Sequence, residues 1–270
     1  MGYVFSFEDA QAYDAWFHKE TGHMALAIEK EAISRLWSPT PGKRLLEVGC
    51  GTGIFLQWFA EQGLLVTGLD PSPYMLNLAR QRLANRADLE RGLAEDLPFS
   101  DNAFDVVALI TTLEFVDDPL HAIQEACRVA REKVLLGVLN KYSLISWQRR
   151  LESLWKASLY RHARFFSVFE LQQLVAEALS GPVPVRWRTC LALPLGALKF
   201  LRSMERSRYI QWQPFGHFIA MAVDIRYTLR LNQQPLFQKI PPAMQPSHPR
   251  ATCWHLPKKE QQDYRPSVNF

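Results

Sequence analysis

The sequence predicts an α/β fold in which helices cover both faces of a mostly parallel sheet. From residue 44 to residue 139, short apolar runs that fit buried strands alternate with segments of helical periodicity. The run at 45–48 leads directly into the glycine cluster 49–53, which indicates a tight turn between a strand and a helix. The next apolar run, at 64–69, ends at Asp70. The unit is therefore strand, glycine turn, helix and strand, and it closes on a carboxylate.

The composition is that of a globular protein with one main core. The chain has 270 residues, of which 48% are hydrophobic and 21% are charged. Its apolar runs are shorter than the roughly 18 residues that a membrane span needs. The first residues lack the basic and apolar regions of a secretory signal, so we expect a cytoplasmic protein. Four widely spaced cysteines predict reduced thiols and no metal site.

Charge is distributed unevenly along the chain. Residues 1–140 carry 12 basic and 20 acidic side chains, a net charge of −8, whereas residues 141–270 carry 19 and 7, a net charge of +12. A basic half can serve an anionic partner. The alternative is that these side chains solvate the exposed faces of helices, as most charge runs do.

The amino-terminal region reads as a helical cap over residues 1–42. Apolar spacing predicts one or two helices within 8–37, with Gly22 as the break between them. The turn cluster at 38–42 then separates this cap from the core, which begins at Arg44.

The glycine turn has the pattern E-x-G-x-G-x-G, beginning at Glu47. Glycines allow the backbone to approach a ligand closely, and an acid at the end of the following strand can accept hydrogen bonds from both ribose hydroxyls. No Lys-Ser/Thr pair follows the turn, and Glu47 would repel a pyrophosphate, which argues against a P-loop. The pattern therefore predicts a nucleoside site that ends at Asp70.

The remaining elements of the core follow in order. Ser72 is a suitable N-cap and Pro73 fits the first position of the helix after the second strand. Strands are expected at 89–93, 104–110 and 134–139, and a helix begins at Asp118-Pro119. The fourth strand is apolar nearly throughout, which is typical of a strand buried on both faces.

The last 130 residues carry weaker patterns. Residues 144–160 form a basic amphipathic helix that covers the active site or, alternatively, lies on an anionic membrane surface. Ser167 and Glu170 form a capping box for a helix that ends near Leu179. Two strands are expected at 183–190 and 217–227, and the proline-rich tail at 233–270 argues against regular structure.

Three segments together resemble the class I S-adenosylmethionine-dependent methyltransferases, in particular the small-molecule branch that includes the ubiquinone/menaquinone methylases. They are RLLEVGCGTGIFLQWFAEQGLLVTGLD at 44–70, AEDLPFSDNAFDVV at 94–107 and LEFVDDPLHAIQEACRVAREKVLLGV at 113–138. The resemblance covers about residues 10–140. It implies a three-layer, Rossmann-like, seven-stranded sheet over residues 43–232, in which the last strand lies antiparallel beside the fifth. Helical insertions are then expected at about 144–165 and 191–213.

The resemblance also implies S-adenosylmethionine as the cofactor. The positions that match the family's binding residues are Glu47, Gly49, Cys50, Gly51, Gly53, Asp70, Pro71, Met75, Ala94, Glu95, Asp96, Thr111 and Thr112. Tyr13 and Trp16 either lie over the cofactor or pack as core aromatics, and Met75 has the same two alternatives. Relatives often carry Asp or Asn where this chain has Leu93. Glu95 or Asp96, or backbone groups alone, would then contact the adenine amino group.

The implied reaction is an in-line methyl transfer, in which the enzyme mainly aligns donor and acceptor. A base is needed only if the nucleophile carries a proton. Glu114 and Asn140, at the exits of the fourth and fifth strands, are the candidates for a catalytic role, although either could instead bind the cofactor's amino group or cap backbone. We expect a small, apolar or amphipathic acceptor. The alternatives are a nucleic-acid methyltransferase, favoured by the basic half, and a non-catalytic protein that binds the cofactor.

Overall fold

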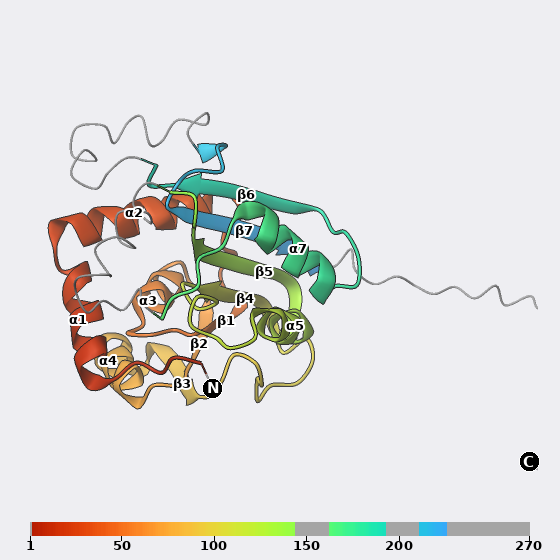
Figure 1. Ribbon diagram of the computed structural model, residues 1–270. Coiled ribbons are helices and arrows are strands. Elements are labelled where there is room, and N and C mark those ends of the chain that lie inside the picture. Colours follow the sequence, from red (N-terminus) through yellow and green to blue (C-terminus); the bar gives the residue numbers. More distant parts are fainter. Residues whose placement is uncertain (1, 144–161, 193–210, 226–270) are drawn as a thin grey trace, which may run out of the picture. The chain divides into compact units, whose positions relative to one another are not determined.

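A computed structural model describes residues 2–143, 162–192 and 211–225. Its strands form a seven-stranded sheet of order β3-β2-β1-β4-β5-β7-β6, which can be followed in Figure 1. The strands are β1 (Arg44–Val48), β2 (Leu65–Asp70), β3 (Ala87–Arg91), β4 (Phe104–Ile110), β5 (Ala130–Leu139), β6 (Val185–Cys190) and β7 (Phe218–Asp224). The helices are α1 (Phe7–Phe17), α2 (Glu20–Ser34), α3 (Ile54–Glu61), α4 (Pro73–Leu83), α5 (Pro119–Val129) and α7 (Val168–Ala178), with a short 3₁₀ turn at Ala84–Arg86.

The direction of the strands confirms the predicted sheet. Strands β1 to β5 are parallel, with Val48 beside Leu69 of β2 on one side and Leu109 of β4 on the other. Strand β7 lies antiparallel between β5 and β6, as the resemblance implied. The chain winds from β1 to β3 in one direction and continues from β4 in the other. The neighbours β1 and β4 are therefore the point where the topology switches, and ligands of such sheets bind there, beyond the carboxyl ends of the strands.

Local sequence signals explain where several helices begin. The Ser72 hydroxyl accepts a hydrogen bond from the Met75 amide at 3.3 Å, and the Asp118 carboxylate accepts one from the His121 amide at 3.0 Å. Ser167 and Glu170 form the expected capping box at the start of α7. These three predicted helix starts are confirmed.

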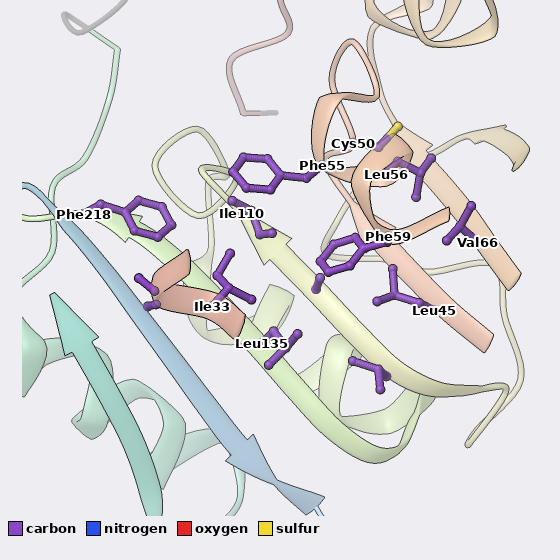
Figure 2. Packing of buried hydrophobic residues seen from close by; sticks show 14 of the residues in the cluster. Ile33, Leu45, Cys50, Phe55, Leu56, Phe59, Val66, Ile110, Leu135 and Phe218 are labelled. Carbon is purple, nitrogen blue, oxygen red and sulfur yellow. The ribbon is translucent and has the colours of Figure 1, made fainter. Parts of the chain in front are cut away.

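Two layers of apolar side chains hold the helices on the sheet. One cluster lies under α2, α3 and α4, and the other lies under α5 and α7. Figure 2 shows the first cluster, in which Phe55 and Phe59 of α3 face Leu45 and Ile110 of the sheet. Successive residues of β1 alternate between the two faces, since Leu45 belongs to the first cluster whereas Leu46 and Val48 belong to the second. Glu47 therefore points to the face that α2 and α3 cover.

The predicted break at Gly22 is wrong. The chain breaks between α1 and α2 at His18 and Lys19, and Gly22 lies inside α2. A Cβ at Gly22 would lie 2.2 Å from the Trp16 carbonyl oxygen, so this glycine permits close approach of the two helices and does not end one.

Part of the predicted organisation lies outside the described residues. This holds for most of the insertions at 144–165 and 191–213, including the basic amphipathic segment, and for the whole tail at 233–270. In the ranges that the structure does describe, no helix combines the length and the hydropathy needed to traverse a bilayer.

Candidate functional site

A cavity opens at the carboxyl ends of β1, β2 and β4, at the topological switch point. Ten of the residues that the sequence singled out line it: Tyr13, Gly49, Gly51, Asp70, Pro71, Met75, Ala94, Glu95, Thr111 and Thr112. Seven others do not: Trp16, Glu47, Cys50, Gly53, Asp96, Glu114 and Asn140. Side chains from four separate stretches of the chain thus meet around one space.

The turn after β1 is shaped by its glycines and by the end of β2. The amides of Gly49 and Cys50 both donate to the Leu69 carbonyl oxygen, at 2.7 and 3.0 Å. Gly51 has a φ of +52°, and a Cβ built there would lie 3.9 Å from the side chains of Met75 and Tyr13, at ordinary van der Waals distance. This glycine therefore leaves room beside the cavity that a larger side chain would fill.

Asp70 joins the turn after β1 to the start of α4. Its Oδ2 accepts a hydrogen bond from the Gly51 amide and its Oδ1 accepts one from the Ser72 amide, each at 2.9 Å. The residue is only 7% exposed. Burial raises the pKa of Asp70 to about 6, although the two amides oppose the shift. Each oxygen keeps a lone pair, so the carboxylate can accept two further hydrogen bonds from a ligand in the cavity.

Glu47 lies beneath the glycine turn and not in the cavity wall. It is 2% exposed, and its Oε2 has no hydrogen-bond partner in the described part of the chain. Burial, together with the nearby charge of Asp70, raises the pKa of Glu47 well above its ordinary value, while Lys30 of α2 acts in the opposite direction. Burying a carboxylate oxygen without a hydrogen-bond donor costs free energy. Such an oxygen is therefore a candidate for binding a ligand that brings a donor.

The exit of β4 supplies the wall opposite Asp70. Thr111 has a φ of +55°, a region that β-branched residues rarely adopt, and its amide donates to the Gly137 carbonyl oxygen at 2.7 Å. The Thr112 hydroxyl donates to the Val48 carbonyl oxygen at 2.8 Å. Strained backbone of this kind concentrates at functional sites. No sequence pattern indicated it, because nothing in a threonine pair specifies a left-handed residue.

The segment after β3 closes another side of the cavity. Leu93, Ala94 and Glu95 line it, whereas Asp96 is exposed and lies outside the wall. Glu95 Oε1 accepts a hydrogen bond from the Asp117 amide at 3.0 Å, which ties this segment to the exit of β4.

Residues 2–5, which we call the amino-terminal strap, form a wall that sequence reasoning missed. All four residues line the cavity. The Tyr3 amide donates to the Phe115 carbonyl oxygen at 2.9 Å, and the Ser72 hydroxyl donates to the Phe5 carbonyl oxygen at 2.7 Å. The Phe5 ring meets Phe115 edge-on, with centroids 4.9 Å apart, and lies 6.1 Å from Tyr13.

The two aromatic candidates of α1 occupy different places. Tyr13 lines the cavity, whereas Trp16 packs against the core cluster under α2 and α3. An ion pair fixes α1 in this position. Arg82 of α4 lies 2.5 Å from Asp14 of α1, and the same guanidinium donates to the hydroxyl and the carbonyl oxygen of Thr52 in the glycine turn.

Glu114 and Asn140 are buried and are not among the residues that line the cavity. Glu114 is 1% exposed, and its Oε1 accepts a hydrogen bond from the Leu139 amide at 2.6 Å. The Asn140 side chain donates to the carbonyl oxygens of Pro214 and Gly216, both at 2.7 Å, and accepts from the Tyr142 amide at 3.1 Å. Asn140 thus joins the exit of β5 to the loop before β7. Its catalytic role stays a prediction.

The chain is similar in sequence to known methyltransferases. The sequence matches a family model described as a methyltransferase domain over residues 46–137. An uncharacterised protein of Methanocaldococcus jannaschii is 32% identical over 170 residues, which are 62% of this chain and 77% of that protein. A malonyl-[acyl-carrier protein] O-methyltransferase of Serratia marcescens is 36% identical over 126 residues, 45% of this chain and 49% of that protein.

A solved structure has a similar fold. A crystal structure from Thermotoga maritima, described as a SAM-dependent methyltransferase and possible histamine N-methyltransferase, matches with a TM-score of 0.63 and 26% identity. The match covers 81% of this chain and 97% of that one.

Proposed function

This chain belongs to the class I S-adenosylmethionine-dependent methyltransferases, and from that premise we propose that it methylates a small, apolar or amphipathic acceptor in the cavity described above. The family match and the methyltransferase relatives establish the enzyme class and the cofactor. Two relatives whose descriptions name an acceptor differ from each other, one acting on malonyl-[acyl-carrier protein] and the other possibly on histamine. The acceptor is therefore argued from this chain's own residues.

The residues around the cavity fit S-adenosylmethionine. The observation that carries the proposal is the bond between the Gly51 amide and Asp70 Oδ2, because it sets a carboxylate beside a glycine wall at the switch point. In our proposal Asp70 accepts hydrogen bonds from the ribose hydroxyls, and Leu93, Ala94 and Met75 contact the adenine. Glu95 remains the candidate for the adenine amino group. Glu47, with its unpartnered oxygen, is the candidate for attracting the ammonium of the methionine part.

The bound cofactor supplies an electrophilic methyl group on a positively charged sulfur. The work of the protein is then to align an acceptor with it and to exclude water. Phe5, Tyr13 and Phe115 bring apolar ring surface to the cavity, which supports an acceptor with apolar parts. Thr111 and Thr112 lie at the β4 exit and line the cavity, and we place the methyl group beside them.

Two glycine variants test the cofactor site. Gly51 and Gly42 both have a positive φ, and a Cβ would meet nothing closer than 3.9 Å at either, but only Gly51 lines the cavity. Gly51→Ala and Gly42→Ala should therefore lower stability by a similar amount, about 1 kcal/mol. Only Gly51→Ala should weaken binding of S-adenosylhomocysteine in calorimetry, by at least about tenfold. If both variants bind S-adenosylhomocysteine with equal affinity, the cofactor does not bind in this cavity.

A further inference from the structure

We propose that Arg82 is a positioning residue for the cofactor, because its guanidinium holds α1 against the glycine turn and thereby keeps Tyr13 in the cavity wall. The inference rests on the proposed cofactor site and adds a residue outside the cavity that determines how tightly this site binds. Three features of the structure support it: the sparse packing of α1, the place of Tyr13, and the contacts of the Arg82 guanidinium.

Helix α1 buries little of its surface. Ala10 is the one buried residue among its eleven, whereas α2 buries six of its fifteen. Trp16 adds partial packing against the core cluster under α2 and α3. Elements with few buried apolar side chains open locally at a low cost in free energy. The polar contacts of α1 therefore have a large share in fixing its position.

Tyr13 is the residue through which α1 reaches the cavity. A Cβ built on Gly51 would lie 3.9 Å from the Tyr13 ring, so the ring stands close to the glycine turn. The rings of Phe5 and Phe17 meet Tyr13 edge-on, with centroids 6.1 and 5.0 Å away. Tyr13 is thus packed within the amino-terminal region, and a displacement of α1 would change the space beside Gly51.

The Arg82 guanidinium joins α1 to the glycine turn. It lies 2.5 Å from the carboxylate of Asp14, the residue after Tyr13. It also donates to the hydroxyl of Thr52, at 2.8 Å, and to the Thr52 carbonyl oxygen. Thr52 directly follows Gly51, so one rigid guanidinium contacts the neighbours of two cavity residues. We call these contacts with Asp14 and Thr52 the Arg82 tie.

The ion pair in this tie is charged at neutral pH and is partly shielded from water. The side chains of Arg82 and Asp14 are 19% and 20% exposed, and salt screens such pairs less than fully exposed ones. Burial by itself raises the pKa of Asp14, but the hydrogen bond and the charge of Arg82, with smaller effects of Thr52 and His18, bring it below its ordinary value.

The Arg82 tie links the position of α1 to cofactor affinity. When only a fraction of the molecules has the binding conformation, the apparent affinity falls in proportion to that fraction. Without the tie, α1 opens more often, and Tyr13 completes the cavity wall in fewer molecules. Loss of the tie should therefore weaken cofactor binding while the protein remains folded.

Two variants break the ion pair and change the net charge in opposite directions. They are Arg82→Met and Asp14→Asn, and their affinity for S-adenosylhomocysteine is measured by calorimetry. We expect both to bind at least about fivefold more weakly than wild type, because each one frees α1. The double variant should bind within twofold of the weaker single variant, since one interaction is removed in all three. If Arg82 acted only through its charge, the two single variants would shift the affinity in opposite directions.

Two control variants separate positioning from general effects. Gly42→Ala lowers stability through its positive φ, but Gly42 does not line the cavity, so affinity should stay within twofold of wild type. Arg80→Met removes a positive charge from the exposed face of α4 and should also bind like wild type. Hydrogen exchange measured by mass spectrometry should be several-fold faster in α1 of Arg82→Met than in α1 of wild type or Gly42→Ala, with α2 unchanged.

A Tyr13→Ala background tests the route by which Arg82 acts. Tyr13→Ala should itself weaken binding of S-adenosylhomocysteine, and adding Arg82→Met to it should change the affinity by less than about twofold. A further fivefold loss in this background would overturn the role of Tyr13 in the proposal.

The remaining outcomes distinguish this inference from the proposed function. Wild-type affinity in Arg82→Met or in Asp14→Asn, or shifts of opposite sign in the two, overturns the positioning role while the cofactor site stands. An equal loss in Gly42→Ala also overturns it, because the effect would then follow stability alone. If the wild-type protein does not bind S-adenosylhomocysteine at all, the proposed function itself fails.

Discussion

Replacing Asp70 by alanine tests the ribose contact that we propose for the cofactor site. The side chain lines the cavity, and each of its oxygens accepts only one backbone amide. Two hydrogen bonds from ribose hydroxyls to this carboxylate would each contribute about 1.5–3 kcal/mol, or about 3–6 kcal/mol together. Part of that is offset by removing the last hydration from Asp70. We therefore expect an affinity loss of at least tenfold, with on the order of 10²-fold as the central value.

The assay is titration calorimetry with S-adenosylhomocysteine, with Asp88→Ala as the control. Asp88 lies on the neighbouring strand β3 and is exposed, so its removal changes the charge by the same amount without touching the cavity. Circular dichroism checks that both variants are folded. A folded Asp70→Ala protein that binds within threefold of wild type would refute the ribose assignment.

The pH dependence of binding supplies a second measure of the same contact. Asp70 is ionised above its pKa of about 6, so cofactor affinity should be full at pH 8 and fall as the pH drops through 6. Between pH 7 and pH 5 the loss should be about tenfold. Stability should change in the opposite direction. The folded pKa is raised, so ionised Asp70 destabilises the fold above pH 6, and acidification relieves that cost. Affinity that is constant from pH 8 to pH 5 would contradict this reading.

Three further predictions concern the surroundings of the site. Arg82→Met removes the ion pair and hydrogen bonds between α1 and the glycine turn, so it should lower the free energy of unfolding in urea by about 1–2 kcal/mol. Arg80→Met, on the exposed face of α4, should not lower it. Equal free energies of unfolding for the two variants would show that the Arg82 contacts add no stability. Ser72→Ala removes both the N-cap of α4 and the hydrogen bond to the Phe5 carbonyl oxygen of the strap, so cofactor release measured by stopped flow should be several-fold faster. An unchanged release rate would show that the strap does not retain the cofactor. RNA binding in filter assays should be weak with a shallow salt dependence; a log–log slope near −4 to −5, which about six engaged basic residues would produce, would instead favour a nucleic-acid acceptor.

The sequence predicted those features that depend on neighbours in the chain. The glycine turn, Asp70 at the end of β2 and the caps at Ser72, Asp118 and Ser167 are all encoded within a few residues, and each lies where it was expected. The antiparallel position of β7 came from the family resemblance, because no local pattern specifies which strand becomes its neighbour.

Features that depend on contacts between residues far apart in the sequence could not be predicted from it. The amino-terminal strap has no periodicity, and its place depends on Phe115 and Ser72, more than 60 residues away. Tyr13 and Trp16 share a helix face, so the sequence could not decide which one reaches the cavity. The unpartnered oxygen of Glu114 results from packing among β4, β5 and α2, which a linear pattern does not contain.

The strap also bears on how the protein should be produced. Gly2 already lies against the exit of β4, where a Cβ would come 2.4 Å from the Phe115 carbonyl oxygen. A peptide tag fused ahead of this residue would begin at the rim of the proposed cofactor cavity, so we expect it to alter the cavity wall. Preparations tagged at the amino terminus should therefore differ from untagged ones in cofactor affinity, and the untagged form is the appropriate reference for every binding constant.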